Sequence, residues 1–271
     1  MPHLLVAGQQ VHYVRRVPAP ANQPSLLFIH GAGGSHQHWL NEVQELTRGS
    51  PTLPLYAPDL PGHGLSDGPG RDSIQSYANL LVGFLDAAAL DQVVLVGHSM
   101  GGAIALEVAI NHPERVVALG LVATGAQLRV APVILDSIRQ DSDRAVRLIC
   151  EKAYRPDAAP EVLRTSQRQM SAIPSEVLYG DFVACDRFDA VSRLAAIQVP
   201  VLVLCGTRDQ LTPPRFSTYL RDHIGGAQLH MIEGAGHMPM IEQPEAVAQA
   251  LRGFLAGLQS TEKCPTAAPP A

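Results

Sequence analysis

The sequence predicts an α/β fold, in which a mostly parallel β-sheet is covered by helices on both faces. Short runs that are apolar throughout, such as residues 25–30 and 92–96, alternate with segments that show helical spacing of apolar residues. Strands that are apolar on both faces are typical of a buried parallel sheet. One long stretch, residues 125–198, has helical patterns but no strong strand and is too long for a loop, which predicts a helical insertion.

The elements follow in order along the chain. Residues 3–7 and 11–16 flank Gly8 and read as a strand pair joined by a tight turn. Further strands are expected at residues 25–30, 52–58, 92–96, 116–123, 199–205 and 228–232. Helices are expected at residues 74–89, 101–114, 214–223 and 244–258.

These elements predict two structural units and a tail. The core comprises residues 1–124 and 199–258, and the helical insertion of residues 125–198 follows the sixth strand and sits on the sheet. The insertion has as many acidic as basic residues, so it is not expected to steer charged substrates strongly. Residues 259–271 are rich in Pro and Ala, which predicts a disordered tail.

Charge and composition exclude several classes of protein. The 271 residues carry a formal net charge of −5 without any basic run, which argues against nucleic-acid binding. The longest nearly apolar stretch, residues 116–126, is shorter than the roughly 18 residues needed to span a membrane. Four cysteines without a CxxC pair and an N-terminus without a basic region favour the cytoplasm. The oligomeric state is left open.

Gly97-His98-Ser99-Met100-Gly101 matches the pattern G-x-S-x-G. It ends a predicted buried strand and opens a predicted helix, which is the setting of a nucleophile elbow. The glycines are required because strand and helix backbones come too close for side chains, and the sharp turn lifts the serine hydroxyl above the sheet. Ser99 is therefore the candidate nucleophile; the alternative is a plain turn that contains a serine.

A nucleophilic serine needs a base, and the base needs an acid that orients it. Asp209 follows the strand at residues 199–205, and His237 follows the strand at residues 228–232, so both are expected at the carboxyl edge of the sheet. The alternative is a structural role for both. Weaker candidates are His230 within a strand, His223 at a helix end, and three carboxylates in the insertion that are expected to be surface charges: Asp181, Asp186 and Asp189.

The oxyanion formed during attack needs preorganised hydrogen-bond donors. The amide of Met100, at the start of the helix after Ser99, is one candidate. The second is the amide of Ala32, in the loop His30-Gly31-Ala32-Gly33-Gly34, where glycines let the backbone turn an amide toward a ligand. Alternatively, this loop is only a glycine-rich connection.

No metal ion or cofactor is expected. His36 and His38 are two residues apart at a helix start, which projects their rings away from each other. Asp59 and His63 lie in a loop rich in Pro and Gly, where a role in a turn is favoured over catalysis. Trp39 is expected in the core.

Five motifs occur in a familiar order: HGAGG, DLPGHGLS, GHSMGG, GTRDQLTPP and GAGHMPMIEQPE. Across residues 10–258 the chain resembles the α/β-hydrolase superfamily, and in particular its carboxylesterase-like members with a serine nucleophile. The resemblance implies the α/β-hydrolase fold, with residues 125–198 as a cap over the pocket. It also implies the same five site residues: Ser99 as nucleophile, Asp209 as acid, His237 as base, and Ala32 with Met100 as the oxyanion hole.

The expected activity is hydrolysis of a small-molecule carboxylic ester through an acyl-enzyme. A serine nucleophile excludes haloalkane dehalogenases and epoxide hydrolases, which use aspartate. A C–C bond hydrolase of the meta-cleavage-product type is the main alternative, although those enzymes usually carry Asn at the position of His98. Enol-lactonase and thioesterase activities stay open, as does a ligand receptor or pseudo-enzyme on the same fold.

Overall fold

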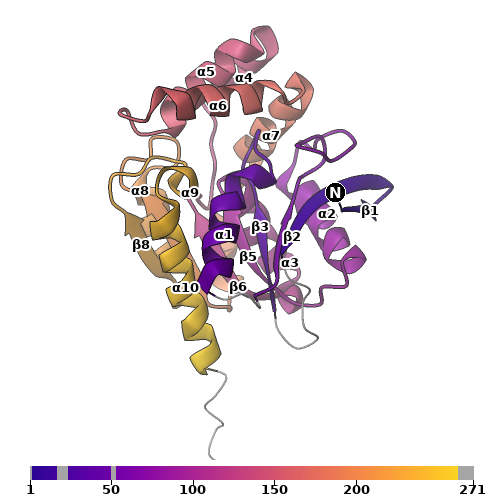
Figure 1. Cartoon of the computed structure of the whole chain (residues 1–271), viewed down its shortest axis with the longest axis vertical. Coiled ribbons are helices and arrows are strands. Elements are labelled where there is room, and N and C mark those ends of the chain that lie inside the picture. Colours follow the sequence, from indigo (N-terminus) through magenta and orange to yellow (C-terminus); the bar gives the residue numbers. More distant parts are fainter. Residues whose placement is uncertain (1, 17–23, 50–52, 262–271) are drawn as a thin grey trace, which may run out of the picture.

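The computed structural model describes residues 2–16, 24–49 and 53–261, and these form an eight-stranded sheet with helices on both faces (Figure 1). The strand order is β1-β2-β4-β3-β5-β6-β7-β8; β2 pairs antiparallel with β1 and β4, and the other neighbours pair parallel. The predicted α/β class is confirmed. The strands are β1 His3–Val6, β2 Gln9–Arg16, β3 Ser25–Ile29, β4 Leu55–Pro58, β5 Val93–His98, β6 Val116–Val122, β7 Val201–Gly206 and β8 Gln228–Ile232.

Each face of the sheet has its own apolar core because side chains of a strand alternate between faces. In β5, Val93 and Leu95 pack with helices α2 (Ile74–Ala87) and α3 (Met100–Asn111). Val94 and Val96 point the other way, toward the core formed with α1 (Leu40–Gly49) and α10 (Pro244–Thr261). Helix α8 (Pro214–His223) joins the first face, and the short α9 (Pro239–Glu242) joins the second. Three 3-10 turns complete the core: η1 His36–Trp39, η2 Pro113–Arg115 and η3 Val191–Ala196.

Four helices that follow β6 lie together above the sheet edge (Figure 1). They are α4 Pro132–Gln140, α5 Ser142–Ala153, α6 Pro160–Ser171 and α7 Ser175–Arg187. Ile138, Val146, Ile149 and Leu178 form a small core between them. We call these four helices the cap helices.

Several element ends differ from the sequence expectations. Helix α3 ends at Asn111, before Glu114, because Pro113 cannot continue the helical hydrogen bonding and starts a 3-10 turn instead. Helix α10 continues to Thr261, so residues 259–261, predicted to belong to a disordered tail, are helical. Residues 262–271 and Thr52 lie outside the described residues.

Two further sequence expectations concern membranes and cysteines. Among the helices of the described residues, none has the length and apolar character needed to cross a bilayer. Cys150, Cys185 and Cys205 are buried free thiols.

Candidate active site

Ser99 occupies a strained turn between β5 and α3. Its backbone has φ 51° and ψ −116°, in the left-handed half of conformational space that residues other than glycine rarely adopt. A side chain on Gly97 would lie 2.1 Å from the Gly101 carbonyl oxygen, and one on Gly101 would lie 2.3 Å from that of Ile29. The spacing of the two glycines is therefore a steric requirement of this turn.

Backbone contacts hold Ser99 in this conformation. Its amide donates to the Val122 carbonyl at 2.9 Å, and its carbonyl accepts from the Thr124 hydroxyl at 2.8 Å. Val122 is the last residue of the neighbouring strand β6 and Thr124 follows it by two residues, so the strained turn is fixed to this edge of the sheet. Ser99 lines a cavity under the cap helices.

Asp209 and His237 meet at the carboxyl ends of β7 and β8, as the sequence predicted. Oδ2 of Asp209 lies 2.9 Å from Nδ1 of His237, and both residues are only 4% exposed. The other carboxylate oxygen accepts the amides of Leu211 and Thr212 at 2.8 and 2.9 Å. The Thr212 hydroxyl donates to Oδ2 of Asp209 at 2.8 Å. This set of donors fixes the carboxylate and, through it, the orientation of the imidazole.

The surroundings of Asp209 favour its ionised form. Burial raises the pKa of the carboxyl, but the charge of His237 and the hydrogen bonds from His237 and Thr212 outweigh burial and hold the pKa below its usual value. A negative Asp209 accepts the Nδ1 proton of His237, which leaves Nε2 as the basic atom of the ring.

Ser99 and His237 line a cavity of about 330 Å³ between the core and the cap helices. Most of its walls are apolar side chains of the cap helices and adjoining loops, including Leu128, Ile134, Leu148, Met170 and Phe182. The enclosed space therefore suits an apolar ligand whose reactive group lies at the Ser99 end.

The loop after β3 brings Ala32 to the wall of this cavity. The amide of Gly34 donates to the Gly31 carbonyl at 3.1 Å, which closes a turn with Ala32 and Gly33 at its two central positions. Among the hydrogen bonds of the described residues, none uses the Ala32 amide. Met100, the second predicted donor, begins α3, where amides have no partner within the helix.

Two histidines in the cavity wall were missed as site residues by the sequence analysis. Nε2 of His98 lies 2.9 Å from the carbonyl of His237, to which it donates. Burial, reinforced by the charge of His237, holds the pKa of His98 well below its usual value, and burial lowers the pKa of His38 to about 4. Both rings are thus neutral. The only sequence signal was the position of His98 beside the nucleophile.

Asp181 corrects a prediction. It was expected to be a surface charge of the insertion, but it is fully buried. Its carboxylate accepts from the Gly33 amide at 2.9 Å, from Nε2 of His63 at 2.8 Å and from the Tyr77 hydroxyl at 2.6 Å. Burial lowers the pKa of His63, but the charge and hydrogen bond of Asp181 outweigh it and raise this pKa. His63 and Asp181 thus form a buried ion pair between core and cap.

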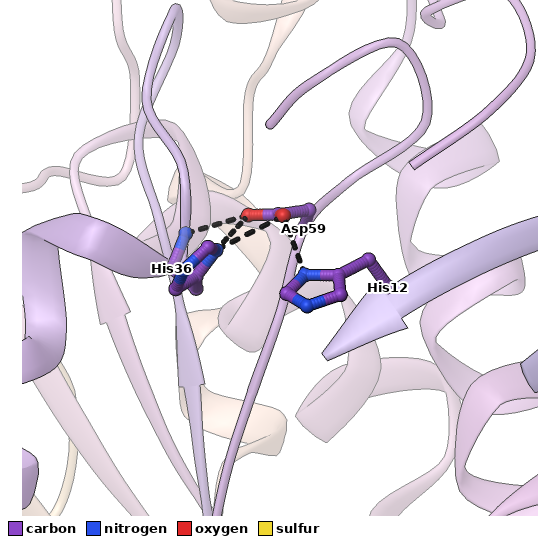
Figure 2. Close-up of side chains that lie close together, drawn as sticks. All are labelled: His12, His36 and Asp59. Carbon is purple, nitrogen blue, oxygen red and sulfur yellow. Dashed lines mark hydrogen bonds and ion pairs between the residues drawn. The ribbon is translucent and has the colours of Figure 1, made fainter. Parts of the chain in front are cut away.

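A second buried cluster, His12, His36 and Asp59, offers donor atoms of the kind that bind metal ions (Figure 2). Their nearest ligand atoms lie within 4.8 Å of one another. Nδ1 of His12 lies 2.8 Å from Oδ2 of Asp59, and Nδ1 of His36 lies 2.9 Å from Oδ1. The amides of His36 and Leu65 also donate to this carboxylate. In this arrangement Nδ1 of each imidazole donates its proton to Asp59, and a metal ion would have to displace both of these protons. Hydrogen bonding alone therefore explains why the three residues lie together.

The remaining candidates lie elsewhere. His230 is exposed on β8, and His223 is exposed at the end of α8, where its ring bonds the Tyr219 carbonyl at 2.9 Å. Asp186 accepts from the Val130 amide, and Asp189 is exposed and pairs with Gln127 and Arg129 near the start of the cap. Trp39 is fully buried against Phe28, with ring centres 4.9 Å apart.

Comparisons with known proteins agree with this architecture. A family model described as the alpha/beta hydrolase family matches residues 26–250. A pimeloyl-(acyl-carrier protein) methyl ester esterase of Neisseria meningitidis serogroup C is 30% identical over 90% of this chain and 98% of that protein. The solved structure of a thermophilic esterase is 32% identical, with a TM-score of 0.81 over 95% of this chain and 97% of that one. An enol-lactonase from Burkholderia xenovorans LB400 shares the fold, with a TM-score of 0.87 over 94% of this chain and 100% of that one at 24% identity.

Proposed function

The chain belongs to the alpha/beta hydrolase family, and on that basis we propose that it is a serine hydrolase that cleaves small-molecule carboxylic esters through an acyl-enzyme. The observation that carries this proposal is the buried Asp209–His237 pair, 2.9 Å apart, beside the strained Ser99 turn at one cavity. Nucleophile, base and orienting acid are the minimum set for acyl transfer at a serine.

The chemistry follows from the order of these groups. The Ser99 Oγ attacks the ester carbonyl while Nε2 of His237 takes its proton. The imidazolium, stabilised by Asp209, then gives this proton to the leaving alcohol, and the acyl group stays on Ser99. Water enters, loses a proton to His237 and attacks the acyl-enzyme by the same route, which releases the acid and restores the serine.

We assign the amides of Ala32 and Met100 as the hydrogen-bond donors to the oxyanion of each tetrahedral intermediate. Both are backbone donors on fixed elements, so they need no rearrangement when charge develops. In the best-studied serine hydrolases, loss of one such donor costs roughly 100- to 1000-fold in kcat.

The cavity indicates the kind of ester. Apolar cap side chains suit an uncharged acyl or alcohol group with a hydrocarbon portion, because burial of each CH₂ contributes about 0.8 kcal/mol. The Neisseria relative, named as a methyl ester esterase, supports an ester as the substrate class. We therefore assign carboxylic esters of apolar acids as the preferred substrates.

Trapping of the acyl-enzyme tests the proposal. The protein is mixed with a series of p-nitrophenyl esters, quenched in acid within milliseconds and analysed by intact and peptide mass spectrometry. We expect an adduct of the acyl mass on Ser99 that is absent from S99A, together with steady release of p-nitrophenol. Folded wild-type protein that turns over none of the esters and carries no adduct would overturn the proposal.

A further inference from the structure

Asp181 links the cap to the loop that carries the Ala32 amide. It lies on α7, one of the cap helices, whereas all three groups that donate to it belong to the core. One of them, the Gly33 amide at 2.9 Å, belongs to the residue directly after Ala32. We propose that Asp181 is a positioning residue that sets the oxyanion hole, so that the hole depends on the seating of the cap. This inference rests on the proposed function.

The first step concerns the peptide plane in front of Ala32. This plane contains both the Gly31 carbonyl and the Ala32 N–H, which point in opposite directions. The Gly31 carbonyl accepts from Nδ1 of His30 at 2.8 Å and from the Gly34 amide at 3.1 Å. Burial lowers the pKa of His30 to about 3, so its neutral ring donates from Nδ1 while Nε2 accepts from the Leu60 amide at 2.9 Å. His30 holds this plane from the core, but its second donor, Gly34, is the last residue of the turn, so the direction of the Ala32 N–H also depends on the turn keeping its shape.

The second step concerns the peptide plane after Ala32, which the core does not fix. Gly33 has φ 63°, so the turn from Gly31 to Gly34 has the left-handed third residue of a type II turn. In a type I turn the central peptide is inverted, and the Ala32 carbonyl would point where the Gly33 N–H now points. The Asp181 carboxylate accepts an N–H and repels a carbonyl oxygen. It thus selects the observed orientation.

The third step concerns what holds Asp181 itself. The Tyr77 hydroxyl and the His63 imidazolium fix its two oxygens from the core side, and all three residues are buried. The cap also packs directly on the turn: a methyl group placed on Gly33 would lie 2.8 Å from Leu178 Cδ1. The carboxylate is therefore a rigid acceptor, and removal of its charge acts on the turn rather than on a mobile side chain.

The Asp181→Asn variant is the direct test, because it keeps the shape but replaces one acceptor by an NH₂ donor. When the amide oxygen accepts from Tyr77, the NH₂ group faces the Gly33 N–H and favours the inverted peptide. We expect kcat to fall about 10- to 100-fold, less than for complete loss of an oxyanion donor, with KM changed by less than about threefold.

A transition-state mimic distinguishes a specific effect of Asp181 on the oxyanion hole from a general loosening of the cap. A trifluoromethyl ketone forms an adduct with serine that carries an oxyanion, whereas the corresponding secondary alcohol binds only as a substrate-shaped ligand. In D181N the affinity for the ketone should fall by the same factor as kcat/KM, and that for the alcohol should not change. A folded D181N with wild-type kcat, or with a loss confined to KM, would overturn the inference.

Matched variants complete the experiment. R187A removes another contact of the same helix α7, an exposed ion pair 3.1 Å from Asp72, and should leave kcat unchanged. Y77F removes one donor to Asp181 and leaves the Gly33 hydrogen bond in place. It should lower the melting temperature but reduce kcat less than D181N does. If D181N does not fold, D181E keeps the charge opposite His63 but displaces the acceptor from Gly33, and the same loss of kcat is expected.

The two proposals fail in different ways. If wild-type protein neither hydrolyses esters nor forms an adduct on Ser99, the proposed function fails. If wild-type protein is active and S99A is inactive, but folded D181N (or D181E, where D181N does not fold) matches wild type in kcat, only the role of Asp181 fails.

Discussion

The imidazole of His98 donates to the backbone carbonyl of His237 over 2.9 Å, which ties the residue before the nucleophile to the loop that carries the base. The two rings lie with their centres 4.8 Å apart. A neutral side chain thus links the Ser99 turn to the His237 loop, and the contribution of this link can be tested directly.

His98→Ala should lower both activity and stability. The variant leaves the buried His237 carbonyl without its donor, which costs about 1–3 kcal/mol of unfolding free energy. It also releases the base, and a displacement of about 1 Å can cost roughly 100-fold in rate. His98→Gln keeps an N–H group that can reach the His237 carbonyl, so it should retain most of the activity and most of the stability. Denaturant unfolding and kcat would check this; an H98A protein with wild-type kcat would assign His98 to packing alone.

Asp209→Asn should fold but lose activity. The Leu211 and Thr212 amides keep the side-chain oxygen of the variant at the Oδ1 position, so the NH₂ group faces Nδ1 of His237 and donates to it. This holds the imidazole in the wrong tautomer, and the equivalent change costs roughly 10⁴-fold in kcat in the best-studied triad. Because triad members act as a unit, D209N combined with H237A should cost little beyond H237A alone. Steady-state kinetics of the three variants decide this. Fully multiplicative losses would mean that Asp209 acts independently of His237.

Cap substitutions should change substrate preference more than the chemistry. Leu148 lines the cavity from α5 and lies on a different element from each of the five predicted site residues. Leu148→Ala should favour longer acyl chains and Leu148→Phe shorter ones, with the ratio of kcat/KM for octanoyl and butyryl esters shifted by about tenfold in opposite directions. If instead both variants lost activity on every ester while folded, the cap would contribute a group to the reaction itself.

The buried pair of His63 and Asp181 should make stability depend on pH. The pKa of His63 is raised in the folded protein above an unfolded value of about 6.5. Its stabilising contribution is therefore complete below about pH 6.5 and is lost as pH rises through the folded pKa. The difference in unfolding free energy between wild type and H63Q should shrink over that range in urea titrations from pH 5.5 to 9. If the difference stayed constant with pH, His63 would be neutral in the folded protein, which would contradict the ion pair.

Local sequence patterns were sufficient for the strands, the Ser99 turn and the positions of Asp209 and His237. Each of these depends on signals within a few residues: an apolar run, a required glycine, or a polar residue directly after a strand. Asp181 could not be predicted in this way. Its burial depends on how α7 docks on Gly33, His63 and Tyr77, which are distant in sequence.

The histidine cluster shows the same limit. His12, His36 and Asp59 come from three separate segments, and they meet only when β2, the 3-10 turn η1 and the loop after β4 are assembled (Figure 2). In the sequence, His36 is grouped with His38 as a possible metal pair because the two are only two residues apart. In the fold, His36 turns to Asp59, while His38 faces the cavity.

Covalent labelling by a fluorophosphonate tests the central claim most directly, because the reagent requires an activated serine and an oxyanion hole but no particular acyl group. Labelled protein is digested and mapped by mass spectrometry, with the labelling rate measured for wild type, H237A and H230A. We predict a single adduct on Ser99, formed at a similar rate in H230A and far more slowly in H237A. An adduct on another serine, or well-folded wild-type protein without an adduct, would contradict the account.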